Sequence, residues 1–325
     1  MRRTYFVGRI LATFLCWGVL SSAPISNARA DVPTVRVAVL KFGTVNWLLD
    51  TVLHNKLDEK EGVKLEVVPL AGKAATAIAF QSGDADMLVT DWIWAMRQRS
   101  REKALLFHPY SRALGALVTK DITDLCALPG QTIGVVGGEL DKSWLVLQAL
   151  ADRRCDIDLA GETKALYGAP PLMSRQLEDG AVAAVSTYWH FVAKLEAKGM
   201  MPIVRVSEAL TDLGISPAPP LIGFVWDTDR TEAEAAEALI SAIDAAGQIL
   251  AESDDAWSRL RPLMRAKSDA EFVALRDAYR AGTPNEWTTA ETASAQKLYD
   301  LLTKRAGKAF TDQAGPFDPT VFPGN

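Results

Sequence analysis

The sequence is poor in the residues that build most catalytic and metal centres. Only three cysteines and three histidines occur among its 325 residues. The histidines, His54, His108 and His190, lie far apart, and no pair has the spacing of zinc ligands. There is no G-x-S-x-G nucleophile elbow and no complete P-loop or dinucleotide fingerprint. We therefore expect a protein that is not an enzyme and that needs no metal or cofactor.

Long hydrophobic runs are absent beyond the N-terminus, so no later segment is predicted to cross a membrane. Near the N-terminus, Arg2, Arg3 and Arg9 precede an apolar run over residues 10–20, and Ala28-Arg29-Ala30 matches a small-x-small cleavage site. This pattern predicts a signal peptide over residues 1–30 and a soluble protein exported to the periplasm. A buried N-terminal helix is the alternative.

An excess of positive charge is also absent. The net charge is −5, and cleavage would remove four arginines and no acid, leaving 31 basic against 40 acidic residues. An acidic surface disfavours nucleic acids and anionic lipids as partners. Cys126 and Cys155 would remain in an oxidising compartment, either as a disulfide or as two buried free thiols.

One stretch, residues 65–96, has the pattern of a strand–helix–strand unit. It contains a predicted strand at 65–69, a tight turn at 71–73, a helix at 74–81, a polar stop at 82–84 and a second strand at 85–89. Thr90, Asp91 and Trp92 follow that second strand. Such units build parallel sheets, whose ligands lie beyond the carboxyl ends of the strands.

The same plan recurs 97 residues later. Residues 35–39 align with 132–136, Trp47 with Trp144, and Trp92 with Trp189. A true repeat and two lobes that merely share β-α-β patterning are both compatible with this match. Residues 231–308 are predicted to be nearly all helical, in a supporting role.

Three segments, read together, carry a family resemblance. They are KLEVVPLAGKAATAIAFQSGDADMLV, LCALPGQTIGVVGG and ALYGAPPLMSRQLEDGAVAAVSTYWHFVAKLEAKG. In this order the chain resembles periplasmic substrate-binding proteins of ABC importers, in particular the nitrate/sulfonate/taurine and thiamine-precursor group. The resemblance implies an α/β fold of the type II periplasmic binding protein class, with two Rossmann-like lobes joined by two crossing strands and C-terminal helices packed on the first lobe. The implied first lobe comprises residues 31–118 and 220–325, and the second comprises residues 119–219.

The resemblance places the ligand in the cleft between the lobes. Loops at strand ends and helix starts supply backbone N–H groups for anions, hydroxyls that orient a polar ligand, and aromatic faces. Ordinary turns whose lysines reach into water are the alternative for each loop. The candidate ligand-binding residues are Lys41, Phe42, Thr44, Asn46, Gly72, Lys73, Thr90, Asp91, Trp92, Gly138, Leu140, Asp141, Ser143, Thr187, Tyr188, Trp189 and His190.

The second-lobe exit departs from the family pattern. Many members carry an acid entering this strand and a Trp-Glu-Pro-type sequence after it, where this chain has Ala183 and then Tyr188-Trp189-His190-Phe191. The resemblance implies a monomeric solute-binding component that captures a small polar or anionic molecule, such as a sulfonate, nitrate or a thiamine precursor, and delivers it to an ABC permease. The alternative is an accessory or maturation protein of the same fold that binds a partner enzyme, such as an oxidoreductase, and does not transport.

Overall fold

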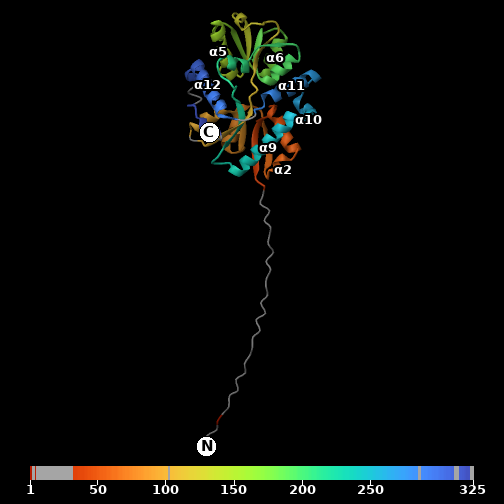
Figure 1. Cartoon of the computed structure of the whole chain (residues 1–325), viewed down its shortest axis with the longest axis vertical. Coiled ribbons are helices and arrows are strands. Elements are labelled where there is room, and N and C mark those ends of the chain that lie inside the picture. The colour runs from red at the N-terminus through yellow and green to blue at the C-terminus, as the bar shows by residue number, and fades with distance from the viewer. Residues whose placement is uncertain (2–3, 5–31, 102, 285–286, 311–314, 323–325) are drawn as a thin grey trace. The chain divides into compact units, whose positions relative to one another are not determined.

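Two five-stranded sheets, each covered by helices, form the framework of the chain (Figure 1). The structure is a computed structural model that describes residues 1, 4, 32–101, 103–284, 287–310 and 315–322. From residue 32 onward the chain forms one compact unit. All but two residues of the predicted signal peptide, 1–30, lie outside the described residues. None of the described helices combines the length and the apolar character needed to cross a membrane.

The first sheet has the order β2-β1-β3-β10-β4. Its strands are β1 (Thr34–Leu40), β2 (Lys64–Leu70), β3 (Met87–Asp91), β4 (Leu105–Ser111) and β10 (Ile222–Asp227). β1 pairs in parallel with β2 and β3, whereas β10 runs antiparallel between β3 and β4. The central strand β1 is largely buried, which explains its nearly continuous apolar sequence.

The second sheet repeats this arrangement, with the order β7-β6-β8-β5-β9. Its strands are β5 (Ala116–Thr119), β6 (Thr132–Val136), β7 (Lys164–Gly168), β8 (Ala184–Thr187) and β9 (Met201–Arg205). β6 pairs in parallel with β7 and β8, and β5 lies antiparallel between β8 and β9. Met87 and Ala184, which begin β3 and β8, are 97 residues apart, as the sequence comparison predicts.

Helices connect the strands. The first-lobe helices are α1 (Val45–His54), α2 (Leu57–Lys60), α3 (Lys73–Ser82) and α4 (Trp92–Arg99). The second lobe has η1 (Leu125–Ala127), α5 (Lys142–Cys155), α6 (Pro170–Glu178), α7 (Trp189–Glu196) and α8 (Val206–Asp212), with α5 and α6 on either side of its sheet (Figure 1). The C-terminal part has α9 (Ala233–Glu252), α10 (Asp254–Met264), α11 (Asp269–Gly282), α12 (Thr289–Ala306) and η2 (Pro319–Val321).

The apolar spacing of residues 47–59 predicts one helix, which the structure divides into α1 and α2. Lys56 has a left-handed backbone with φ of 53°, which ends the first helix and starts the second at a new angle. Nothing in the apolar spacing of this segment signals the break. Helix α8 was likewise absent from the predicted elements.

The chain crosses between the lobes twice, just before β5 and just before β10. Because β5 pairs with β8 and β9, residues 116–118 belong to the second lobe, although the predicted boundary assigned them to the first. A glycine lies beside each crossing. A Cβ atom on Gly115 would lie 2.0 Å from the carbonyl oxygen of Thr187, and one on Gly223 would lie 2.2 Å from that of His108. Both glycines allow a close backbone approach that no other residue permits.

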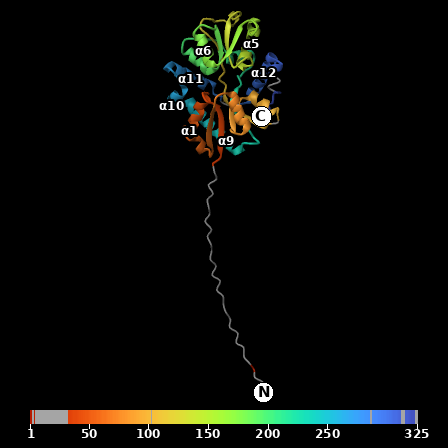
Figure 2. The same ribbon diagram turned by 180° about the vertical axis from the view of Figure 1, so that it is seen from behind.

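The C-terminal helices do not all pack on the first lobe, which corrects one part of the predicted arrangement. Helices α9 and α10 cover the first lobe, but α11 packs against α7 and α12 packs against α5. Arg305 of α12 donates to Gln148 of α5 at 3.3 Å and pairs with Asp158 at 3.2 Å. Figures 1 and 2 show α11 and α12 on opposite sides of the chain. The apolar residues of α12 share one buried cluster with residues of both lobes.

A disulfide joins Cys126 of η1 to Cys155 at the end of α5. Of the two alternatives for this pair, the structure has the cross-link. It ties the loop between β5 and β6 to the second lobe's longest helix.

Candidate functional site

A cavity of about 190 Å³ lies between the two lobes, where strand ends and helix starts converge. The first lobe contributes the start of α1, the start of α3 and the end of β3. The second lobe contributes the starts of α5 and α7, and both chain crossings line the cavity as well. Carboxyl ends of parallel strands are the common location of ligands in such sheets. Its lining is Leu40, Gly43, Thr44, Val45, Lys73, Val89, Thr90, Asp91, Tyr110, Ser111, Ala113, Leu114, Gly115, Asp141, Lys142, Ser143, Tyr188, Trp189, His190, Leu221 and Ile222.

Asp91 links the two lobes across this cavity. One oxygen of its carboxylate accepts from the backbone N–H of Trp94 at 2.9 Å and caps α4. The other accepts from Nζ of Lys142 on the second lobe, also at 2.9 Å. Burial acts to raise the pKa of Asp91, but the ammonium groups of Lys142 and Lys73 outweigh it and hold that pKa below its usual value. Asp91 is therefore charged at neutral pH, and Lys142 is its counterion.

Asp141 plays a similar capping role on the second lobe. Its side chain accepts from the backbone N–H groups of Ser143 and Trp144, at 3.0 and 3.3 Å, and so caps α5. Burial raises the pKa of Asp141 above its usual value, and the neighbouring lysines offset only part of that effect. Two helix starts in the cleft, those of α4 and α5, are thus already occupied by carboxylates of the chain itself.

Lys73 and Tyr188 form a second contact between the lobes. Nζ of Lys73 lies 5.8 Å from the centre of the Tyr188 ring, within the range of a cation–π interaction. Burial raises the pKa of Tyr188 to about 12, so its hydroxyl stays protonated and can act as a hydrogen-bond donor. A small ligand here would meet an ammonium group, a phenol and a carboxylate within one small space.

Trp189 anchors the second lobe in an aromatic cluster of the first. Its ring lies edge-on to Trp47 at 6.0 Å and to Tyr279 of α11 at 6.2 Å between centres. Tyr110 extends the cluster through Tyr279, and its hydroxyl lies 3.2 Å from Oγ1 of Thr44. These rings give the cavity an apolar wall that excludes water.

The structure brings together nine of the predicted residues around this cavity and places the others elsewhere. The nine are Thr44, Lys73, Thr90, Asp91, Asp141, Ser143, Tyr188, Trp189 and His190. An adjoining pocket holds Lys41, Phe42 and Asn46. Neither lining includes Gly72, Trp92, Gly138, Leu140 or Thr187.

Trp92 and Thr187 lie outside both linings because each is buried in the fold. Trp92 is fully buried, with its ring edge-on to Phe317 and Phe322, so it packs the core rather than the cleft. Thr187 is buried where β8 meets the first crossing, and its carbonyl oxygen is the atom that Gly115 approaches. Asn46 reaches its pocket, but its amide donates to Leu40 and Gly43 carbonyls and holds the turn.

The residues that sequence reasoning missed come mainly from the crossings and from α7. Tyr110, Ser111, Gly115 and Ile222 line the floor of the cavity because the chain passes there between the lobes. Their sequence gives no motif, and only the crossing itself could have indicated them. Lys194 of α7 lines the adjoining pocket. It follows His190 by four residues and therefore lies on the same helix face, so this spacing was a signal for it in the sequence.

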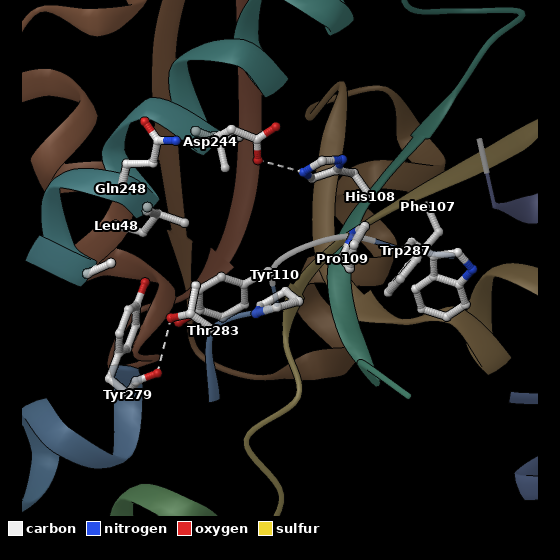
Figure 3. Close-up of a pocket in the computed structure, with 14 residues that line it drawn as sticks. Leu48, Phe107, His108, Pro109, Tyr110, Asp244, Gln248, Tyr279, Thr283 and Trp287 are labelled. Carbon is white, nitrogen blue, oxygen red and sulfur yellow. Dashed lines mark hydrogen bonds and ion pairs between the residues drawn. The ribbon is translucent and has the colours of Figure 1, made fainter. Parts of the chain in front are cut away.

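A larger cavity of about 650 Å³ lies among β4, α9 and the end of α11 (Figure 3), and it shares Tyr110 with the lining of the central cavity. Nε2 of His108 and the carboxylate of Asp244 pair across it at 2.8 Å, and Thr283 donates to the carbonyl of Tyr279. No second-lobe strand or helix contributes to its lining. Filling it would therefore not couple the two lobes.

Within the described ranges, no three histidine, cysteine, aspartate or glutamate side chains gather closely enough to hold a metal ion. The groups that line the cleft can donate and accept hydrogen bonds and can form ion pairs with a charged ligand. They do not include a nucleophile held against a base.

No protein-family model matches the chain, and no curated protein matches it either. Solved structures do. The periplasmic aliphatic sulphonate-binding protein SsuA from Escherichia coli aligns over 84% of this chain and 87% of its own, with a TM-score of 0.65 at 15% identity. An ABC transporter protein from Parabacteroides distasonis aligns over 88% of this chain and 97% of its own, with a TM-score of 0.67 at 13% identity.

The chain has the fold of periplasmic substrate-binding proteins. The resemblance seen in the sequence is thereby confirmed at the level of the fold. The same substrate-binding fold is also found in an enzyme, the desulfurization enzyme DSZB, which aligns over 87% of this chain and 96% of its own, with a TM-score of 0.58 at 15% identity. At these identities the likeness describes architecture, and function must be argued from the cleft.

Proposed function

We propose that the chain is the periplasmic solute-binding component of an ABC uptake transporter and is not an enzyme. The observation that carries this proposal is the cavity between the lobes, which both lobes and both crossings line. A ligand held there touches both lobes at once, so it stabilises the closed arrangement by its differential affinity for that state. The crossings beside Gly115 and Gly223 are the hinge in this mechanism.

The size of the cavity and the charged groups in its lining favour a small polar molecule. A volume of about 190 Å³ is below the range of roughly 300–1,000 Å³ that is typical of drug-sized ligands. The nine predicted residues that surround the cavity are its proposed ligand contacts. Among them, Lys73 and Tyr188 would donate hydrogen bonds, Asp91 would accept one, and Trp189 would cover an apolar part of the ligand.

Small-angle X-ray scattering combined with thermal unfolding tests this proposal. The protein without residues 1–30 is measured with and without a panel of sulfonates, nitrate, thiamine precursors and flavins. The expected result is one class of compound that both raises Tm and reduces the radius of gyration. The panel also includes small molecules that co-purify with the protein and are identified by mass spectrometry. If no compound raises Tm and none reduces the radius of gyration, the proposal is overturned.

A second candidate is an accessory protein that binds another protein through its surface. The contacts that already bridge the cleft, Asp91 with Lys142 and Lys73 with Tyr188, favour it, because they occupy polar groups that a ligand would use. Ile78 and Leu172 are also exposed, at 64% and 54%. Under this candidate no small molecule changes the radius of gyration, whereas a periplasmic partner enzyme co-elutes with the chain in size-exclusion chromatography.

A further inference from the structure

A second pocket, of about 240 Å³, adjoins the central cavity and differs from it in charge. Three elements enclose it: the loop from β1 into α1, one face of α7, and the turn between α10 and α11. It shares Gly43, Thr44 and His190 with the lining of the central cavity, so the two spaces meet there. We call it the basic pocket.

Its charged lining residues are all cationic. Lys41, Lys194 and Arg265 line it, and no aspartate or glutamate does. Among the described residues, none of these three cations forms an ion pair, whereas Lys142 in the central cavity is paired with Asp91. The Arg265 guanidinium and the Lys41 ammonium lie 4.4 and 5.7 Å from the centre of the Phe42 ring. The pocket thus collects positive charge; Glu271 of α11 acts on Lys194 from outside the lining and forms no described ion pair with it.

The pKa of Lys194 reflects this concentration of positive charge. Burial lowers the pKa of Lys194, and neighbouring cations, Arg265 among them, lower it further although Glu271 opposes them. Arg265 also has a left-handed backbone with φ of 54° at the end of α10, a position where glycine is the common residue. Its side chain lines the basic pocket.

Two further groups in this pocket are available to an anion. Nδ1 of His190 is buried and has no hydrogen-bond partner in the part of the chain that the structure describes. Helix α1 (Val45–His54) has no side-chain cap at Thr44. The N–H groups of Asn46 and Trp47 already donate to the carbonyls of Gly43 and Thr44, so among its first N–H groups that of Val45 remains without a described partner. By contrast, Asp91 and Asp141 already cap α4 and α5 in the central cavity.

We propose that the basic pocket binds an oxyanion group, a carboxylate, sulfonate or phosphate, carried by a ligand whose remaining part fills the central cavity. This inference rests on the proposed function and assigns the two ends of its ligand. The central cavity balances its own charges, so it suits the uncharged part. The unpaired cations, Nδ1 of His190 and the start of α1 suit the oxyanion.

Nuclear magnetic resonance of protein labelled with ¹⁵N-histidine tests the pocket directly, with inorganic sulfate as the probe. Sulfate is titrated at constant ionic strength against sodium chloride, because screening alone would otherwise shift the signals. The expected result is a saturable shift of the His190 ring resonances, while those of His54 stay unchanged. No saturable shift at His190 would overturn the proposal.

Charge-removing variants assign the effect to the pocket. Each of Lys194→Gln and Arg265→Gln should weaken sulfate binding about tenfold, the value of one charge-assisted hydrogen bond. Lys60→Gln removes the same charge from an exposed site on α2 and serves as the matched control. Equal weakening in all three variants would indicate a general charge effect and would contradict the proposal. Thermal unfolding of each variant verifies that it is folded.

A series of sulfonates of increasing length tests the link to the central cavity. Butanesulfonate and larger sulfonates should bind more tightly than methanesulfonate, and Arg265→Gln should weaken all of them by about the same tenfold factor, because Arg265 holds the oxyanion and not the organic part. Equal affinity for sulfate and every sulfonate would overturn the two-part assignment. Scattering separates this failure from failure of the proposed function. A panel compound that compacts the protein and binds Lys194→Gln and Arg265→Gln as tightly as the wild type leaves transport standing and removes the basic pocket from it.

Discussion

The ion pair between Asp91 and Lys142 is expected to stabilise the closed arrangement of the lobes. The two charged atoms are 2.9 Å apart, and the side chains are only 9% and 22% exposed. Two unit charges at this distance attract by about 1.4 kcal/mol in bulk water and by about 6 kcal/mol at an effective dielectric constant of 20. Desolvation offsets much of this attraction, so we expect a coupling energy of about 1–2 kcal/mol, above that of an exposed pair.

A double-mutant cycle measures this coupling. Asp91→Asn is chosen because asparagine also caps helices, so the cap on α4 is retained while the charge is removed. Lys142→Gln removes the partner, and urea unfolding of the wild type, both single variants and the double variant gives the coupling as the departure from additivity. Additive free energies of unfolding, within about 0.3 kcal/mol, would show that the pair contributes nothing and would refute this reasoning.

Three other predictions follow from the described geometry. Replacing both Cys126 and Cys155 by serine should lower the free energy of unfolding by about 3 kcal/mol, since the disulfide closes a loop with a separation of 29 residues; equal urea midpoints for oxidised wild type and variant would contradict this. Gly115→Ala should destabilise the fold by about 3 kcal/mol because its Cβ would lie 2.0 Å from a backbone oxygen, whereas Gly247→Ala in α9, with open space around it, should be neutral or stabilising in the same thermal assay. Burial and Lys194 lower the pKa of His190 from 6.5 to about 3. The stability that depends on neutral His190 is therefore complete above pH 6.5, and the free energy of unfolding should fall by about 2 kcal/mol by pH 5. His190→Gln should remove this part of the pH dependence, and an unchanged slope in that variant would contradict the prediction.

The framework could be predicted from the sequence because it depends on local pattern. Buried strands such as β1 and β6 are continuous apolar runs, and turns with glycine or proline separate them from helices. The recurrence after 97 residues indicated two lobes of like topology, and the two sheets have the same strand order. These features require no knowledge of which distant segments touch.

Long-range packing could not be predicted in the same way. The apolar residues of β5 suit either sheet, and only pairing with β8 and β9 assigns them to the second. Trp92 follows a strand end, as a ligand-binding residue would, but the aromatic residues near the C-terminus bury it. Arg265 lies in a helical region whose composition predicts only a structural role. Its side chain nevertheless lines the basic pocket, because α10 ends beside α1.

The contacts across the cleft also bear on affinity. If the Asp91–Lys142 pair stabilises the closed arrangement by about 1–2 kcal/mol, it raises the ratio of closed to open molecules about 5- to 30-fold. A ligand that binds only the closed state then needs to supply that much less free energy, so its apparent Kd is lower by up to the same factor. Asp91→Asn should therefore weaken binding of a ligand even where the ligand does not touch Asp91. A ligand that competes with Lys142 for Asp91 would instead bind more tightly when Lys142 is replaced by glutamine, and the signs of the two changes decide between these cases.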